Sequence, residues 1–163
     1  MLQWLRVRRA RKAAVAAINP HVERSRSRLH GISDAAWRDP YVVGFLAMLI
    51  TLVAQKEESR LGDQALGLVQ LDAWEEITRV KTSNIGEEIC LLSANGDTAF
   101  LSGCRNAQRM FDAFAAEPSV GDGVSAGEAE PSAGTQSGAA SQLWSLLFDD
   151  RLGASPAWLA ELQ

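Results

Sequence analysis

The chain has 163 residues, of which 47% are hydrophobic and 22% are charged, values typical of one globular domain with its own core. Two cysteines without a CxxC pair exclude a disulfide scaffold and a zinc module, and favour a cytoplasmic location. The net charge of −4 is unevenly divided, because residues 1–30 hold eight Arg and Lys against one Glu, whereas residues 117–163 hold one Arg against seven acids. A basic head and an acidic tail are therefore the charge features that bear on partners.

The first 38 residues are predicted to form a basic helical segment. Residues 1–18 are rich in Ala, Arg, Lys and Leu, which favour helix. Asn19-Pro20 predicts the end of this helix, because proline lacks a backbone N–H and restricts the residue before it. Residues 21–30 then predict a second short basic helix.

Residues 39–117 are predicted to form the core of a small bundle of three to four helices. Asp39-Pro40 is a strong start signal, with Asp as the N-cap and Pro at the first helical position. The apolar run 41–54, broken only by Thr51, would span about 21 Å as a helix, short of a ~30 Å hydrocarbon core. It therefore predicts a buried central helix from about Pro40 to Ser59.

Three further helices are predicted in this region. Gly62 and Asp63 mark the start of the first, which is expected to reach about Lys81. Ser83 or Asn84 caps the next, and Gly96 stands where a left-handed C-terminal residue belongs. Asp97 or Thr98 caps the last, at about Ala99–Glu117. Its apolar residues repeat in steps of four and three, which predicts one core-facing stripe: Phe100, Cys104, Ala107, Phe111 and Phe114.

Residues 88–102 also fit a different structure. Asn95-Gly96 between two apolar runs is the pattern of a β-hairpin turn. The helical interpretation is preferred, because the stripe of residues 104–114 continues back through Phe100.

The composition changes sharply after Glu117. Residues 118–138 are rich in Gly, Ser, Ala and Pro and predict a disordered linker. Residues 139–163 are apolar again and predict a short aromatic helical segment of the kind that docks in a groove. Docking on the chain's own bundle and docking on a partner both fit, the former slightly better, since exposed tryptophans reduce solubility. The candidate protein-binding residues are Trp144, Leu147, Phe148 and Trp158.

No sequence motif indicates catalysis, a metal or a cofactor. His21 and His30 lie in a polar, basic stretch, where solvated or capping roles are expected. The acidic pairs at 57–58, 75–76, 87–88 and 149–150 are interpreted as solvated surface, because adjacent helical residues do not share a site. Cys104 leaves open a thiol-dependent enzyme or redox protein as the second alternative function.

The basic head is the remaining candidate site. An anionic membrane would attract it, whereas nucleic acid is disfavoured because the rest of the chain is acidic. The favoured function is a non-catalytic adaptor that binds another protein, and the first alternative is a peripheral binder of anionic surfaces. The sequence leaves the oligomeric state and the partner open. The candidate anion-binding residues are Arg6, Arg8, Arg9, Arg11 and Lys12.

Overall fold

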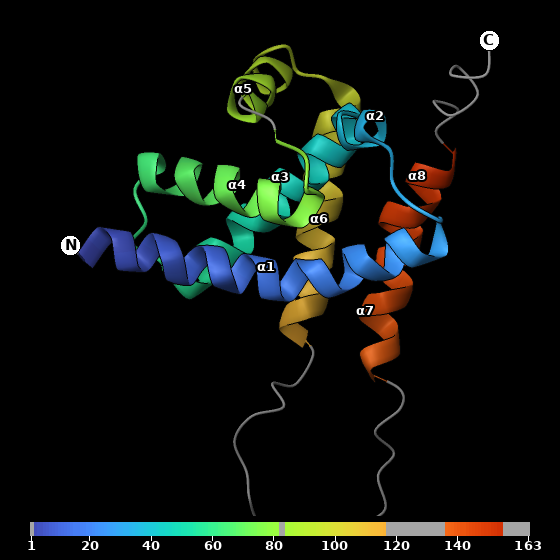
Figure 1. The fold of residues 1–163 in the computed structure, drawn as a ribbon, viewed down its shortest axis with the longest axis horizontal. Coiled ribbons are helices and arrows are strands. Elements are labelled where there is room, and N and C mark those ends of the chain that lie inside the picture. Colours follow the sequence, from blue (N-terminus) through green and yellow to red (C-terminus); the bar gives the residue numbers. More distant parts are fainter. Residues whose placement is uncertain (1, 82–83, 117–135, 155–163) are drawn as a thin grey trace, which may run out of the picture.

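The computed structural model describes residues 2–81, 84–116 and 136–154, and these residues form helices and no strand (Figure 1), which confirms the all-α class. Much of the predicted linker and Trp158 lie outside the described residues. In chain order the elements are α1 (Leu2–Arg28), α2 (Asp34–Trp37), α3 (Pro40–Glu57), α4 (Asp63–Thr78), α5 (Ile85–Ala94), α6 (Thr98–Ala116), α7 (Gln136–Trp144), the π-helical turn η1 (Ser145–Asp149) and α8 (Asp150–Ala154).

Helix α3 is the centre of the core, as the apolar run predicted. Its start is fixed by Asp39, whose carboxylate accepts hydrogen bonds from the backbone N–H groups of Tyr41 at 2.9 Å and Val42 at 3.3 Å. Leu46 and Leu49 are fully buried. By length and composition α3 could also cross a membrane, but 61% of that stretch is buried inside the bundle.

Helix α1 runs unbroken through Pro20, so the expected stop at Asn19-Pro20 is wrong. A proline inside a helix costs about 3 kcal/mol through the lost hydrogen bond and its steric clash. Packing on both sides of the proline offsets that cost. The buried residues recur every four positions across it, on the face that meets α3 and α4: Ala10, Ala14, Ile18 and Val22.

Residues 88–102 form a helical hairpin, not a β-hairpin. Helix α5 ends at Ala94, and Gly96 adopts a left-handed backbone with φ of 62°. Asp97 then accepts a hydrogen bond from the N–H of Phe100 at 2.9 Å and so caps α6. The preferred helical interpretation is therefore confirmed.

Helices α3 and α6 cross at two glycines. A Cβ atom on Gly44 would lie 2.2 Å from the carbonyl oxygen of Phe100, and one on Gly103 would lie 2.2 Å from that of Tyr41. This close approach turns α6 away from the predicted stripe. Phe100 and Ala107 are buried as expected, but Gly103 and Met110 complete the buried face, while Cys104, Phe111 and Phe114 are only partly buried.

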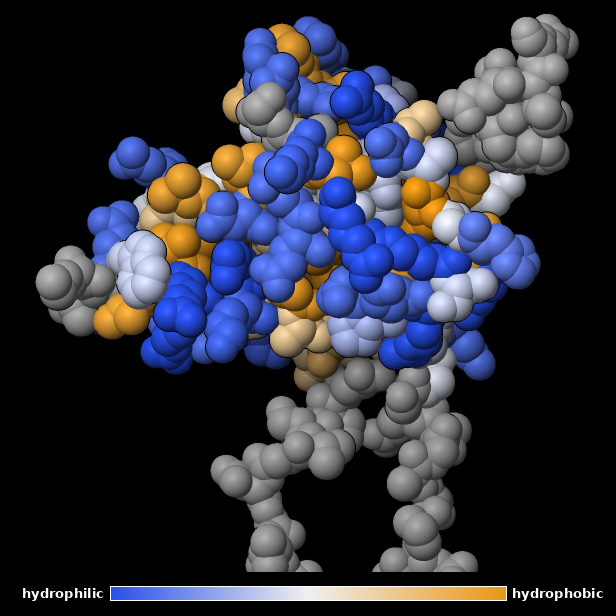
Figure 2. Space-filling model, in the orientation of Figure 1, coloured by the Kyte–Doolittle hydropathy of each residue, from blue (hydrophilic) through white to orange (hydrophobic). Residues whose placement is uncertain are grey.

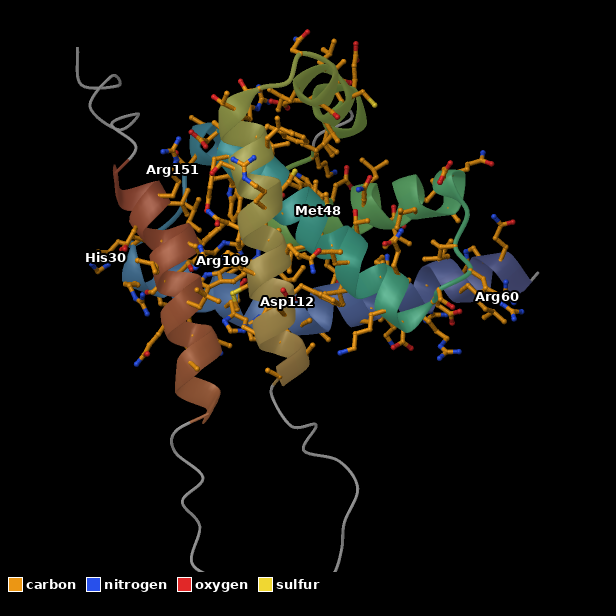
Figure 3. All side chains as sticks on the ribbon, turned by 180° about the vertical axis from the view of Figure 1, so that it is seen from behind. His30, Met48, Arg60, Arg109, Asp112 and Arg151 are labelled. Carbon is orange, nitrogen blue, oxygen red and sulfur yellow. The ribbon has the colours of Figure 1, made fainter. Side chains whose placement is uncertain are left out.

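The C-terminal helices pack beside α6 and across the end of α1 (Figure 1). Seen from behind (Figure 3), α6 and α7 run side by side, and the labelled Arg109 and Asp112 lie on exposed positions of α6. Trp144, Leu147 and Phe148 belong to the same buried cluster as the side chains of α1, α3 and α4. The segment that the sequence set apart from the bundle is thus part of its core.

Candidate functional site

The described residues contain no metal-binding group and no disulfide. No group of three or more His, Cys, Asp and Glu among them could hold a metal ion. Cys90 is exposed and Cys104 is partly buried, and neither forms a disulfide. The Cys104 thiol donates to the Gly44 carbonyl at 3.5 Å, and burial raises its pKa. A raised pKa keeps the thiol protonated at neutral pH, which disfavours Cys104 as a nucleophile.

Two of the five basic residues singled out in the head are engaged by acids of the bundle. Arg9 contacts Glu57 at 3.1 Å and Glu58 at 3.2 Å, and Arg11 lies 3.8 Å from Glu76. Glu57 and Glu76 are exposed, as expected for solvated surface, whereas Glu58 is partly buried. Within the head, Arg9, Arg11 and Arg26 thus pair with acids of residues 2–81, whereas Arg28 pairs with Asp149 of the C-terminal segment.

One of the other three basic residues, Arg8, lies beside an exposed aromatic side chain. The Arg8 guanidinium lies over the Trp4 ring, 5.6 Å from its centroid, and Trp4 is 63% exposed. Arg6 and Lys12 have no ion-pair partner among the described residues, and Lys12 is exposed. This end of α1 therefore combines unneutralised cations with an exposed tryptophan.

The C-terminal segment occupies an aromatic groove formed by the helices before it. Trp144 stacks on His21 at 5.1 Å and meets Phe45 edge-on at 5.6 Å. Phe148 lies 5.7 Å from Phe45 and 6.1 Å from Trp37. Trp144, Leu147 and Phe148 are all buried, so in this structure they are covered by their own chain and are not presented to a partner. Groove rings come from α1, α2, α3 and α6: His21, Trp37, Tyr41, Phe45 and Phe114.

Polar groups anchor the segment in the groove. Asp149 is 5% exposed and accepts hydrogen bonds from Ser25 and from Ser145, and its other partner is Arg28 at 2.6 Å. The Trp144 indole N–H donates to the Ser25 hydroxyl oxygen at 2.9 Å. The interpretation of Asp149-Asp150 as a solvated pair is therefore wrong for Asp149. The only sequence feature that pointed to the burial of Asp149 was its position directly after the largely apolar run Trp144–Phe148.

In the π-helical turn η1, one backbone carbonyl group accepts a hydrogen bond from a side chain of α3. The Tyr41 hydroxyl donates to the Leu147 carbonyl oxygen at 2.7 Å and accepts from the Asn106 amide at 3.0 Å. A side chain bonded to a helical carbonyl competes with the regular i to i−4 ladder, a recognised cause of local distortion. Burial raises the pKa of Tyr41, which keeps the hydroxyl protonated and able to donate.

His21 is buried in this interface, contrary to the solvated role expected for it. Its ring lies between those of Phe114, at 5.2 Å, and Trp144. Burial is the main cause that lowers its pKa to about 4, Arg24 lowers it further, and Asp149 opposes the shift. The imidazole is therefore neutral at pH 7. His30 is exposed at the end of α1, as expected.

Exposed apolar side chains lie on α4 and α5. Helix α5, with the sequence IGEEICLLSA, has only Ile85 buried. Leu91 of α5 is 57% exposed and Leu68 of α4 is 51% exposed. Figure 2 shows several hydrophobic residues over α4 and isolated ones among the hydrophilic residues of α5, and the two helices are in contact. We call Leu68, Ile89, Leu91 and Leu92 the α4–α5 surface, of which Leu68 and Leu91 are exposed and Ile89 and Leu92 are partly buried against the core.

Comparison with known proteins found no matching family model, no significantly similar curated protein and no significantly similar solved structure.

Proposed function

We propose that this chain is a non-catalytic helical adaptor that binds another protein through the α4–α5 surface. The observation that carries the proposal is the mismatch between the composition of α5 and its burial. Five of its ten residues are Ile, Leu or Cys, yet only Ile85 is buried, while Ile89 and Leu92 are partly buried against the core and Cys90 and Leu91 are exposed. Exposed apolar helical faces are the usual docking sites for partner proteins, because covering them removes apolar area from water.

The α4–α5 surface is suited to a partner with a complementary apolar side. Glu87 and Glu88 lie at the start of α5, and Leu91 and Leu92 lie one turn further on. A polar rim around an apolar centre is the usual anatomy of a protein interface. A partner with leucine-sized side chains in its centre and basic residues at one edge would match this arrangement.

The exposed Cys90 next to Leu91 provides the test. A benzophenone maleimide attached to Cys90 in a Cys104→Ala background should crosslink the partner in an extract of the source cells. Leu91→Asp should reduce that product at least tenfold, because a charge at the centre of an apolar interface would lose its hydration without gaining a counter-charge.

The matched control is Leu146→Asp, because Leu146 is a 63% exposed leucine of η1, outside the α4–α5 surface. It should leave the crosslinked product at the wild-type level. Equal loss in both variants, or no loss with Leu91→Asp, would contradict binding through the α4–α5 surface. Circular dichroism of each variant confirms that the fold is kept.

A second candidate function, binding to an anionic membrane surface, is favoured by the N-terminal end of α1. Trp4 and Leu5 are exposed beside Arg6, Arg8 and Lys12. Tryptophan prefers the interfacial region of a bilayer, and each Lys or Arg near an anionic surface contributes about 1 kcal/mol. Fewer residues carry this proposal than the sequence suggested, because Arg9 and Arg11 are paired with acidic residues of α3 and α4.

Retention on phosphatidylserine vesicles at low salt measures this second function. The double variant Arg8→Ala and Lys12→Ala should weaken binding about 30-fold, from two charges at about 1 kcal/mol each. Arg24→Ala is the control, because Arg24 is also an exposed arginine of α1 but lies four turns away. Equal retention of the double variant and the wild type would contradict the proposal.

A further inference from the structure

The groove under the C-terminal helices has the features of a helix-binding site that is filled by the chain's own segment. That segment, residues 136–154, joins the rest of the chain on its N-terminal side through residues 117–135. Nineteen residues span at most about 60 Å when extended, so the segment can leave the groove and stay attached. The groove itself is formed by residues of α1, α2, α3 and α6.

The groove recognises a particular spacing of side chains. Trp144 and Phe148, four residues apart, fill the space between the groove rings. Leu147 is buried beside them, and its backbone carbonyl is held by Tyr41 at 2.7 Å. Asp149 follows and meets Ser25 and Arg28. The groove therefore fits a helix with an aromatic, an aliphatic, an aromatic and an acidic residue at relative positions 0, 3, 4 and 5, counted from Trp144.

Charge on the groove favours an acidic occupant. Arg24 donates to the Ser141 hydroxyl at 2.5 Å, and Arg28 pairs with Asp149 at 2.6 Å. Both arginines lie on the exposed side of α1, where a shallow hollow is lined by Glu23, Arg24, Ser27 and Arg28. Basic residues at the edge of an apolar groove select helices that carry carboxylates on the matching side.

The contact has the character of a separable interface. Its anchors are a serine, an exposed arginine, an indole N–H and a tyrosine hydroxyl, all groups that water can satisfy when the groove is open. The helices beneath the segment contribute most of the buried cluster that the segment completes, including Leu46, Leu49, Ile50, Val69 and Ile77.

We propose that this groove is a binding site for an amphipathic helix of another protein, and that residues 136–154 are its intramolecular competitor. The partner helix carries tryptophan, leucine, phenylalanine and aspartate in the spacing of Trp144, Leu147, Phe148 and Asp149. This second site is separate from the α4–α5 surface and does not depend on it.

Hydrogen exchange of the full chain gives the first test. The amides of α7 and α8 should exchange through a local opening whose protection is at least 100-fold lower than that of the most protected amides of α3. Equal protection in α3 and in α7 would show that the segment opens only when the whole chain unfolds, and would overturn the proposal.

Peptide binding gives the second test, with a fluorescein-labelled peptide of residues 136–154 as the probe. The full-length double variant Trp144→Ala and Phe148→Ala should bind this peptide about 100-fold more tightly than the wild type, because a tethered competitor acts at an effective concentration near the millimolar range. The Asp149→Ala peptide should bind at least tenfold more weakly, and the Leu146→Ala peptide is the matched control and should bind like the parent.

Three results would overturn the proposal. One is a double variant that loses the helical signal of α1 to α6, which would make the segment an inseparable part of the fold. Another is a folded double variant that does not bind the peptide. The third is a concentration-dependent dimer of the wild type that exchanges residues 136–154, which would make a second copy of the chain the occupant. None of these results affects crosslinking from Cys90, so they can be told apart from failure of the α4–α5 surface.

Discussion

Gly103→Ala should destabilise the fold by at least about 3 kcal/mol, at or above the upper end of overpacking costs, because the added methyl meets backbone and not a flexible side chain. The new Cβ would lie 2.2 Å from the Tyr41 carbonyl oxygen and 2.8 Å from the Phe45 backbone nitrogen. Helices α3 and α6 would have to separate, which opens the most extensive helix contact of the described residues. Urea unfolding followed by circular dichroism measures the change.

Gly67→Ala is the matched control for Gly103→Ala. Gly67 lies within α4, and a Cβ atom there would meet nothing within 4 Å. Alanine lowers the entropy cost of forming the helix, so this variant should gain up to about 1 kcal/mol. No loss of stability in Gly103→Ala, or an equal loss in Gly67→Ala, would contradict the role assigned to the close approach of α3 and α6. Gly44→Ala should behave like Gly103→Ala, since its Cβ meets the Phe100 carbonyl at 2.2 Å.

The free energy of unfolding should fall by on the order of 2–3 kcal/mol between pH 6.5 and pH 4 through His21 alone. Its pKa is about 4 in the folded chain, mainly because the ring is buried, against 6.5 in the unfolded chain. Between these two values the unfolded chain binds more protons than the folded chain. Lowering the pH therefore favours unfolding, and the contribution of His21 is complete above pH 6.5 and lost near pH 4.

His21→Phe separates this effect from the titration of carboxylates. Phenylalanine keeps an aromatic ring between Phe114 and Trp144 but binds no proton. Unfolding in urea at a series of pH values should show a decline about 2 kcal/mol smaller for the variant than for the wild type. His30→Gln, at an exposed position, should keep the wild-type decline. A wild-type slope in His21→Phe would mean that the imidazole is not buried in solution.

Local signals in the sequence were sufficient for most helix boundaries within 39–117. Asp39-Pro40, Gly96 and Asp97 each act through hydrogen bonds or backbone angles within a few residues, and the structure uses them as predicted. The apolar run of α3 likewise predicted a buried helix, because a helix that is apolar on all sides must be covered on all sides.

Only the tertiary structure decided which helical faces meet. Pro20 predicted a helix end, but the packing of Ile18 and Val22 on either side holds α1 together through it. The sequence predicted a surface position for Asp149. In the structure its partners are Ser25 and Arg28, which lie more than 100 positions earlier in the chain. The local sequence shows only whether a side chain is apolar or charged. The free energy of burying it depends on groups brought near by distant parts of the chain, and those groups are fixed only when the helices pack.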